Sequence, residues 1–142
     1  MTPTLIGRIQ TRLLLLALVG LPWTIIVVPF LPKGGAPIGD VYAATILALF
    51  VVAFFGVGWE LVYHLVQQYR WEKDWPILFL LLEGIPEGIL TFVVVDAIIL
   101  FGPSPLTFLL HFTSTWVLVW LVAIGPLRIF LLRWRFNGGR VW

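Results

Sequence analysis

The sequence predicts an all-α integral membrane protein, a bundle of four transmembrane helices with both termini in the cytoplasm. The chain has 142 residues, of which 61% are hydrophobic and only 11% charged, and its mean hydropathy is +1.04. A soluble domain carries roughly 45–50% apolar and about 25% charged residues. The composition therefore excludes a water-soluble globule and a disordered chain, and it indicates one transmembrane domain over residues 1–142.

Four apolar runs are each long enough to cross a bilayer. A helix that spans a hydrocarbon core of roughly 30 Å needs about 20 apolar residues. The runs that qualify cover residues 13–31, 41–66, 77–101 and 106–132. Backbone groups find no water partner in lipid, so each run is expected to be helical. Kinks or early ends are expected at the proline residues inside the runs, which are Pro22, Pro29, Pro86 and Pro126.

The basic residues near the ends of the runs predict the orientation. Eight lysines and arginines lie in the N-terminal segment, the loop between the second and third runs, and the C-terminal segment, whereas the other two loops hold only Lys33. The positive-inside rule places both termini in the cytoplasm. Arginine is commoner than lysine, which suggests a bacterial source and hence the inner, or plasma, membrane. Arg133, Arg135 and Arg140 are expected to bind anionic lipid headgroups.

Six ionisable residues lie inside the apolar runs. An isolated charge near the centre of a bilayer costs at least ~2.5–3.5 kcal/mol. We therefore expect these side chains to be sheltered by each other, by a partner protein, by a cofactor or by water. The residues concerned are Glu60, His64, Glu83, Glu87, Asp96 and His111.

Helical spacing and depth divide these residues into two groups. Side chains four residues apart share a helix face, as do Glu60 with His64 and Glu83 with Glu87. Counting turns from the cytoplasmic ends places Glu60 and Glu83 both about 12 Å deep, within reach of each other. Arg128, near the inner end of the last run, is expected to turn toward Glu83 or Glu60.

The second group lies near the outer surface. Asp96 and His111 are both about 8 Å from the outer ends of their runs by the same counting, which predicts an outer-leaflet pair. One interpretation of the two groups is a proton or cation path across the membrane. The other is that these are protonated or ion-paired groups that fix how the helices meet, and from the sequence alone we favour packing.

The segment from Glu83 to Gly88 combines several unusual features. Gly84 and Gly88 form a small-xxx-small pair that allows close approach of another helix. Pro86 frees the carbonyl of Leu82 and kinks the helix. We interpret the segment as a helix-packing seam, with a binding site at a bent helix as the alternative.

The sequence lacks the motifs of several kinds of catalytic, metal and cofactor site. There is no cysteine, and no nucleophile or phosphate-loop motif is present, so no enzymatic activity is predicted. The acidic residues lack the Glu-x-x-His spacing of carboxylate-bridged metal pairs, so no metal is predicted. His64 and His111 lie near opposite surfaces, more than ~15 Å apart, which disfavours an intrachain bis-histidine haem. No cofactor is predicted, and the C-terminal basic stretch is too short to indicate nucleic-acid binding.

The leading functional hypothesis from the sequence is a structural or accessory subunit of a larger membrane complex. It rests on the short connecting segments, the glycine seam and the number of buried polar groups, which exceeds what one bundle is expected to satisfy. The expected partners are other membrane proteins or further copies of the chain. The alternatives are a proton- or cation-conducting transporter or channel that uses the intramembrane carboxylates, and a subunit that carries a cofactor or pigment.

Overall fold

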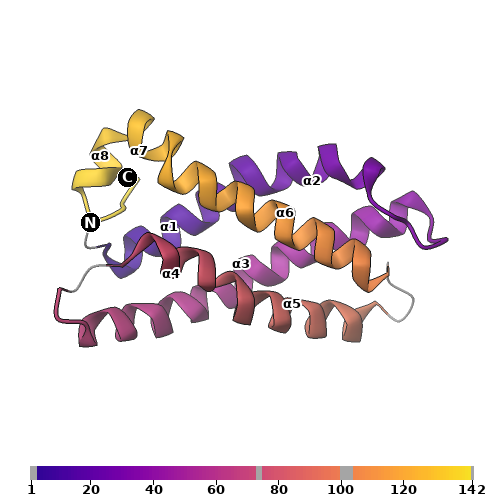
Figure 1. Ribbon diagram of the computed structural model, residues 1–142, viewed down its shortest axis with the longest axis horizontal. Coiled ribbons are helices and arrows are strands. Elements are labelled where there is room, and N and C mark those ends of the chain that lie inside the picture. Colours follow the sequence, from indigo (N-terminus) through magenta and orange to yellow (C-terminus); the bar gives the residue numbers. More distant parts are fainter. Residues whose placement is uncertain (1–2, 73–74, 100–103, 142) are drawn as a thin grey trace.

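The computed structural model describes residues 3–72, 75–99 and 104–141, and every regular element in these ranges is a helix. Four helical stretches are long and apolar enough to cross a membrane: Leu5–Phe30, Ile38–Tyr69, Ile77–Ile98 and Pro105–Phe130. They lie side by side in alternating directions, and both ends of the chain lie at the same end of the bundle (Figure 1). The predicted all-α architecture with four candidate spans is confirmed.

The first stretch begins earlier than predicted and is not uniform. Thr4 caps α1 (Leu5–Leu15) by accepting a hydrogen bond from the Gly7 amide at 3.2 Å. A π-helical turn (Leu16–Gly20) then precedes α2 (Leu21–Val27), and a 3-10 turn (Val28–Phe30) ends the stretch. The π turn ends two residues before Pro22, whose missing N–H disturbs the regular bonding pattern. The early start places the arginines that precede residue 13 inside the helix.

The next two stretches form a helical hairpin. α3 (Ile38–Tyr69) is a continuous helix of 32 residues that starts after Pro37. The third stretch consists of α4 (Ile77–Leu82) and α5 (Gly84–Ile98), with the break at Glu83. Pro86 cannot donate to the carbonyl of Leu82, which accounts for the break there. The end predicted at residue 101 lies outside the described residues.

The last stretch turns sharply near its end. α6 (Pro105–Ile124) is followed by α7 (Pro126–Phe130), and the turn is at Gly125, where φ is −106° and ψ is −97°. A final short helix, α8 (Leu132–Phe136), lies across the end of the bundle near the N-terminus (Figure 1). The segment after α8 bonds to the start of α1, where the Thr4 amide donates to the Gly138 carbonyl at 2.8 Å. Gly138 has a φ of +61°, a conformation that favours glycine.

Helices α5 and α6 approach closely at two glycines. A Cβ at Gly84 would overlap the Trp116 indole, and one at Gly88 would lie 2.7 Å from the Phe112 ring. These two contacts set the antiparallel register of the pair. Glu87, one residue before Gly88, therefore lies at the height of residue 113 on α6.

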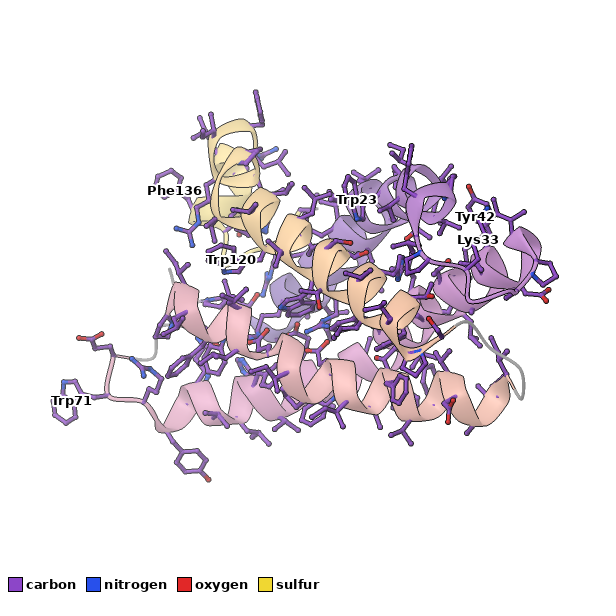
Figure 2. The ribbon with its side chains drawn as sticks, turned by 45° about the vertical axis from the view of Figure 1, so that its right-hand side comes forward. Trp23, Lys33, Tyr42, Trp71, Trp120 and Phe136 are labelled. Atoms are coloured by element: carbon purple, nitrogen blue, oxygen red, sulfur yellow. The ribbon has the colours of Figure 1, made fainter. Side chains whose placement is uncertain are left out.

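The exterior of the bundle is apolar along its length and aromatic at its ends. Large hydrophobic side chains are exposed on all four stretches. Trp71, which is 99% exposed, projects from one end of the bundle, and Phe136 lies toward the same end (Figure 2). Tyr42 and Lys33 lie toward the opposite end (Figure 2). This distribution is consistent with a membrane location, because aromatic rings are enriched at both lipid–water interfaces.

Candidate functional site: a buried arginine–glutamate network

Two arginines of α1 enter the centre of the bundle. Arg8 and Arg12 are four residues apart and share one helix face, and their side chains are only 4% and 7% exposed. Gly56 of α3 leaves the room that Arg12 needs, because a Cβ at this position would lie 2.7 Å from the Arg12 Cδ. The first helix therefore brings two cations to a face of α3 that carries a carboxylate.

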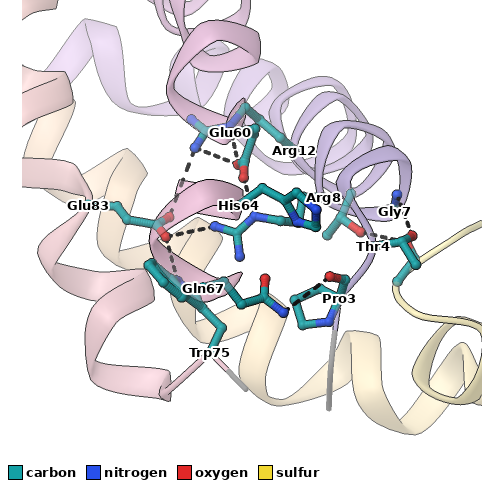
Figure 3. A network of polar contacts seen from close by, with 12 residues as sticks. Pro3, Thr4, Gly7, Arg8, Arg12, Glu60, His64, Gln67, Trp75 and Glu83 are labelled. Carbon is teal, nitrogen blue, oxygen red and sulfur yellow. Dashed lines mark hydrogen bonds and ion pairs between the residues drawn. The ribbon is translucent and has the colours of Figure 1, made fainter. Parts of the chain in front are cut away.

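Arg8 joins α3 to the break between α4 and α5. Its Nε donates to Glu60 Oε2 at 2.6 Å, and its Nη2 donates to Glu83 Oε1 at 3.0 Å (Figure 3). The Trp75 ring covers the guanidinium, with 4.7 Å between Cζ and the ring centroid. The Trp75 indole N–H also donates to Glu83 Oε1 at 2.5 Å. Charge-assisted bonds and a cation–π contact thus hold Arg8 on several sides.

Arg12 contacts the remaining carboxylates. Its Nε donates to Glu60 Oε1 at 2.7 Å, while Nη1 and Nη2 donate to Glu87 Oε2 and Oε1 at 2.5 and 2.8 Å. Its Nη2 lies 4.0 Å from Glu83 Oε2, which is the longest ion-pair distance in the network. Arg12 therefore connects α1, α3 and α5, since Glu60 and Glu87 lie on the latter two helices.

The network has more carboxylates than arginines. Two guanidiniums contact three carboxylates, and each of these five side chains is at most 7% exposed. Fully ionised, the five groups would sum to a formal charge of −1. Buried charges are costly unless they are paired. Glu83 is the least tightly paired of the three, because its arginine contacts are at 3.0 and 4.0 Å.

A cavity of about 130 Å³ lies beside the network. Arg8, Arg12, Glu60 and Glu83 form its charged wall, whereas Glu87 is not among the described residues that line it. The opposite walls are apolar and aromatic, from Leu15, Leu80, Trp116, Val119, Trp120 and Trp134. Arg128 also lines the cavity. The cavity gives small molecules room next to Glu60 and Glu83 but not next to Glu87.

The structure confirms only part of the polar cluster predicted from the sequence. The structure brings together Glu60, Glu83 and Glu87, but Arg8 and Arg12 occupy the place expected for Arg128. Among the described residues, no ion pair joins Arg128 to a carboxylate. The expectation missed these arginines because it began the first helix at residue 13. Thr4 as an N-cap, followed by two arginines at helical spacing, is the signal that reveals them.

His64 lies beside the network and not within it. The interior face of α3 carries Gly56, Glu60, Tyr63 and Gln67, which are all buried. His64 is about 100° further round the helix than Tyr63 and is only half-buried. Its Nε2 lies 3.4 Å from Gln68 Nε2.

The structure does not show the predicted pairing of Asp96 with His111. The interior face of α5 carries Gly84, Glu87, Thr91 and Val95. Asp96 follows Val95 and therefore points outward, where it is exposed. His111 is 1% exposed, and its Nε2 lies 2.8 Å from the hydroxyl of Thr24.

The hydrogen bonds around His111 define its neutral tautomer. The Thr24 hydroxyl donates its proton to the Gly20 carbonyl at 2.8 Å, so it accepts from His111 Nε2–H. Nδ1 is then an acceptor, and it has no hydrogen-bond partner among the described residues. The same holds for the Thr115 hydroxyl, one turn away. A buried polar row with open bonding capacity thus follows α6 through Thr107, His111 and Thr115.

The other predicted residues lie in two places. Gly84 and Gly88 face α6, and Pro86 follows the break between α4 and α5. Arg133 and Arg140 are exposed at the end of the bundle that holds the termini. The side chain of Arg135 lies outside the described residues. Lipid binding by these arginines stays a prediction.

Fold and site together define a small four-helix protein with an apolar exterior and a buried arginine–glutamate network beside a cavity. Among the described residues, no group of three or more histidine, aspartate or glutamate side chains is placed to hold a metal ion. Comparison with known proteins finds no family, no curated protein and no solved structure that matches this chain.

Proposed function

We propose that this chain is a small membrane transporter that exchanges protons at Glu83. The observation that carries the proposal is the imbalance of the network, in which three carboxylates share two arginines and Glu83 is the least tightly paired. Glu83 also lines the cavity, so a water molecule there can reach its carboxyl group. Glu87, which Arg12 contacts at two points, does not line the cavity and is the poorer candidate.

Proton exchange at this position changes the charge of the network by one. With one carboxyl protonated, two arginines face two carboxylates and the buried charges balance. When the proton leaves, the network carries one negative charge in excess, and Arg128 is a further cation that lines the same cavity. A cation without a carboxylate partner beside the cavity therefore supports reversible release, since it lowers the cost of the deprotonated state.

The polar row on α6 supports passage across the bundle. The register of α5 and α6 places Glu87 at a height between His111 and Thr115. Buried waters commonly bridge polar atoms that lack protein partners, such as His111 Nδ1 and the Thr115 hydroxyl. Beyond them, the Thr107 hydroxyl donates to the Pro32 carbonyl near the opposite end of the bundle. The row thus continues from the network toward the far end.

The proposed orientation places the cavity on the cytoplasmic side. Most of the basic residues belong to α1, α7, α8 and the segment that follows α3, at the end that holds both termini (Figure 1), while Lys33 lies toward the other end (Figure 2). The positive-inside rule makes the first of these ends cytoplasmic. A bacterial plasma membrane remains our prediction for the location.

The test is proton flux in liposomes that contain only this chain. An imposed potassium diffusion potential should drive acidification, read from an enclosed pH-sensitive dye. Glu83→Gln should reduce the rate to that of empty liposomes, because the side chain can no longer bind and release a proton. Glu72→Gln removes an exposed carboxylate outside the network and should leave the rate unchanged.

Folding of the Glu83→Gln variant is checked by helical circular dichroism and by elution from a sizing column. Glu83→Asp keeps the titrating group and should retain part of the flux even if its position shifts. Wild-type protein without flux, or wild-type rates in folded Glu83→Gln, would refute the proposal.

A second candidate is the accessory subunit of a larger membrane complex, and the exposure of Asp96 favours it. Asp96 lies on an exterior face of α5 among the exposed apolar residues Ile89, Val93 and Ile98. A carboxylate on such a face is costly unless it reaches the interface or a partner covers it. Asp96→Cys should then form cross-links to another chain in native membranes, whereas Val93→Cys, one turn away, should cross-link less. Equal absence of cross-links at both positions would count against a partner here.

A further inference from the structure

We propose that the cavity binds a small organic anion, with a carboxylate or phosphate group at Arg128 and an apolar body against the tryptophan walls. This goes beyond proton exchange, because it assigns a ligand to the cavity and stands whether or not Glu83 moves protons.

Of the buried side-chain nitrogen and oxygen atoms in the described cavity wall, one has no hydrogen-bond partner among the described residues. Arg8 and Arg12 bond to the carboxylates of the network. The four indole N–H groups have acceptors, which for Trp75, Trp116, Trp120 and Trp134 are Glu83 Oε1, the Leu81 carbonyl, the Ile77 carbonyl and the Thr11 hydroxyl. The exception is Arg128, whose Nε is buried and has no hydrogen-bond partner among the described residues. The open bonding capacity of the wall therefore belongs to a donor.

Charge favours an anion over a cation. Arg8 and Arg12 are already paired with Glu60, Glu83 and Glu87, whereas Arg128, the remaining charged residue of the described cavity wall, has no carboxylate within ion-pair distance among the described residues. A guanidinium presents a planar set of donors that matches a carboxylate or phosphate group at two points. Arg128 belongs to α7, directly after the turn at Gly125, and this turn directs the end of the fourth stretch over the cavity.

The size and walls of the cavity limit the rest of the ligand. A cavity of roughly 150 Å³ holds a benzene-sized molecule, and this one measures about 130 Å³. Trp116, Trp120 and Trp134 offer flat apolar surfaces. The ligand part that enters the cavity is therefore no larger than one ring or a short aliphatic chain. A free aromatic carboxylate fits this description, and so does the phosphate end of an anionic lipid.

Benzoate is the probe, with benzyl alcohol and benzylamine as neutral and cationic matches of the same size. The full chain is placed in phosphatidylcholine nanodiscs, and binding is measured by titration calorimetry and by tryptophan fluorescence, with empty discs as the blank. Benzoate should bind at least ten-fold more tightly than either match. Arg128→Gln should weaken benzoate binding roughly 10- to 100-fold, as expected for the loss of a charge-assisted contact. Arg128→Lys should retain part of the affinity.

The control is Arg133→Gln, which removes an exposed arginine outside the cavity wall and should leave benzoate affinity unchanged. A second set of discs contains phosphatidic acid. Weaker benzoate binding there, restored by lowering the phosphatidic acid content, identifies lipid phosphate as a competing source of the same anionic group. Equal affinity for benzoate and benzylamine, or wild-type benzoate affinity in Arg128→Gln, would overturn the proposal. No proton gradient is present, so failure of binding and failure of proton exchange are separate results.

Discussion

Arg12 and Glu87 form a two-point ion pair across the bundle, with 2.5 Å between Nη1 and Oε2 and 2.8 Å between Nη2 and Oε1. The two residues are 75 positions apart in the sequence. Arg12 uses its Nε for Glu60 at the same time. One guanidinium thereby connects the first helical stretch to the second and the third, so its removal affects the packing of all three.

Arg12→Met is expected to lower the free energy of unfolding by roughly 3–5 kcal/mol, because it leaves Glu87 buried without a counter-charge. Adding Glu87→Met should restore most of the loss, since replacing both partners of a buried ion pair by apolar groups is often neutral. The measurement is thermal unfolding of purified protein in a mild detergent, followed by circular dichroism. Arg133→Ala, at an exposed position, should change stability by less than about 0.5 kcal/mol. A double variant as unstable as Arg12→Met would show that the pair has another role.

Gly84→Ala is expected to destabilise the protein by roughly 1–3 kcal/mol, since the new methyl group overlaps the Trp116 indole. Gly58→Ala is the matched control, because a Cβ there has no neighbour within 4 Å. Alanine is the better helix former by roughly 0.5–1 kcal/mol, so Gly58→Ala should be neutral or stabilising. The same unfolding measurement compares the two. Equal effects would mean that the approach of α5 to α6 contributes little to stability.

The four helical stretches were predictable from the sequence, because each is determined by the composition and length of its own apolar run. Each apolar run needs internal hydrogen bonds in lipid, and its length alone predicts a span. The carboxylates Glu60 and Glu83 were also predictable as neighbours, since both depth and spacing follow from 1.5 Å per residue. The start of α1 was not, because a single capping residue, Thr4, moves it two turns earlier than the apolar run suggests.

Which side chains pair with each other in the site was harder to predict than which residues belong to it. In a helix that is apolar all round, hydrophobic periodicity does not show which face points inward. Asp96 and Val95 differ by one position, about 100° of rotation, and only the second faces the interior. Arg128 was predicted as the partner of the carboxylates, but Arg8 and Arg12 take this place. The sequence does not show which helix face an arginine lies on, and its long side chain reaches partners on whichever helix it faces.

Thr24→Val is expected to destabilise the protein by roughly 1–3 kcal/mol, because the buried His111 Nε2–H loses its acceptor. Combining it with His111→Leu should recover part of the loss, since both polar partners are then absent. Thr113→Val, at an exposed position on the same helix as His111, is the control and should be close to neutral. Thermal unfolding gives the comparison. Wild-type stability in the Thr24→Val variant would show that His111 finds another acceptor.

The orientation can be tested directly, because the chain contains no cysteine and single cysteines are therefore unambiguous labels. Lys33 and Asn137 are both exposed and lie toward opposite ends of the bundle. A membrane-impermeant maleimide added to intact bacterial spheroplasts that express the chain should label Lys33→Cys, because the proposed orientation places this loop outside. Asn137→Cys should be labelled only after the membrane is made permeable. The reverse pattern would place the cavity and its arginines on the outer side, and it would contradict the cytoplasmic position proposed for both termini.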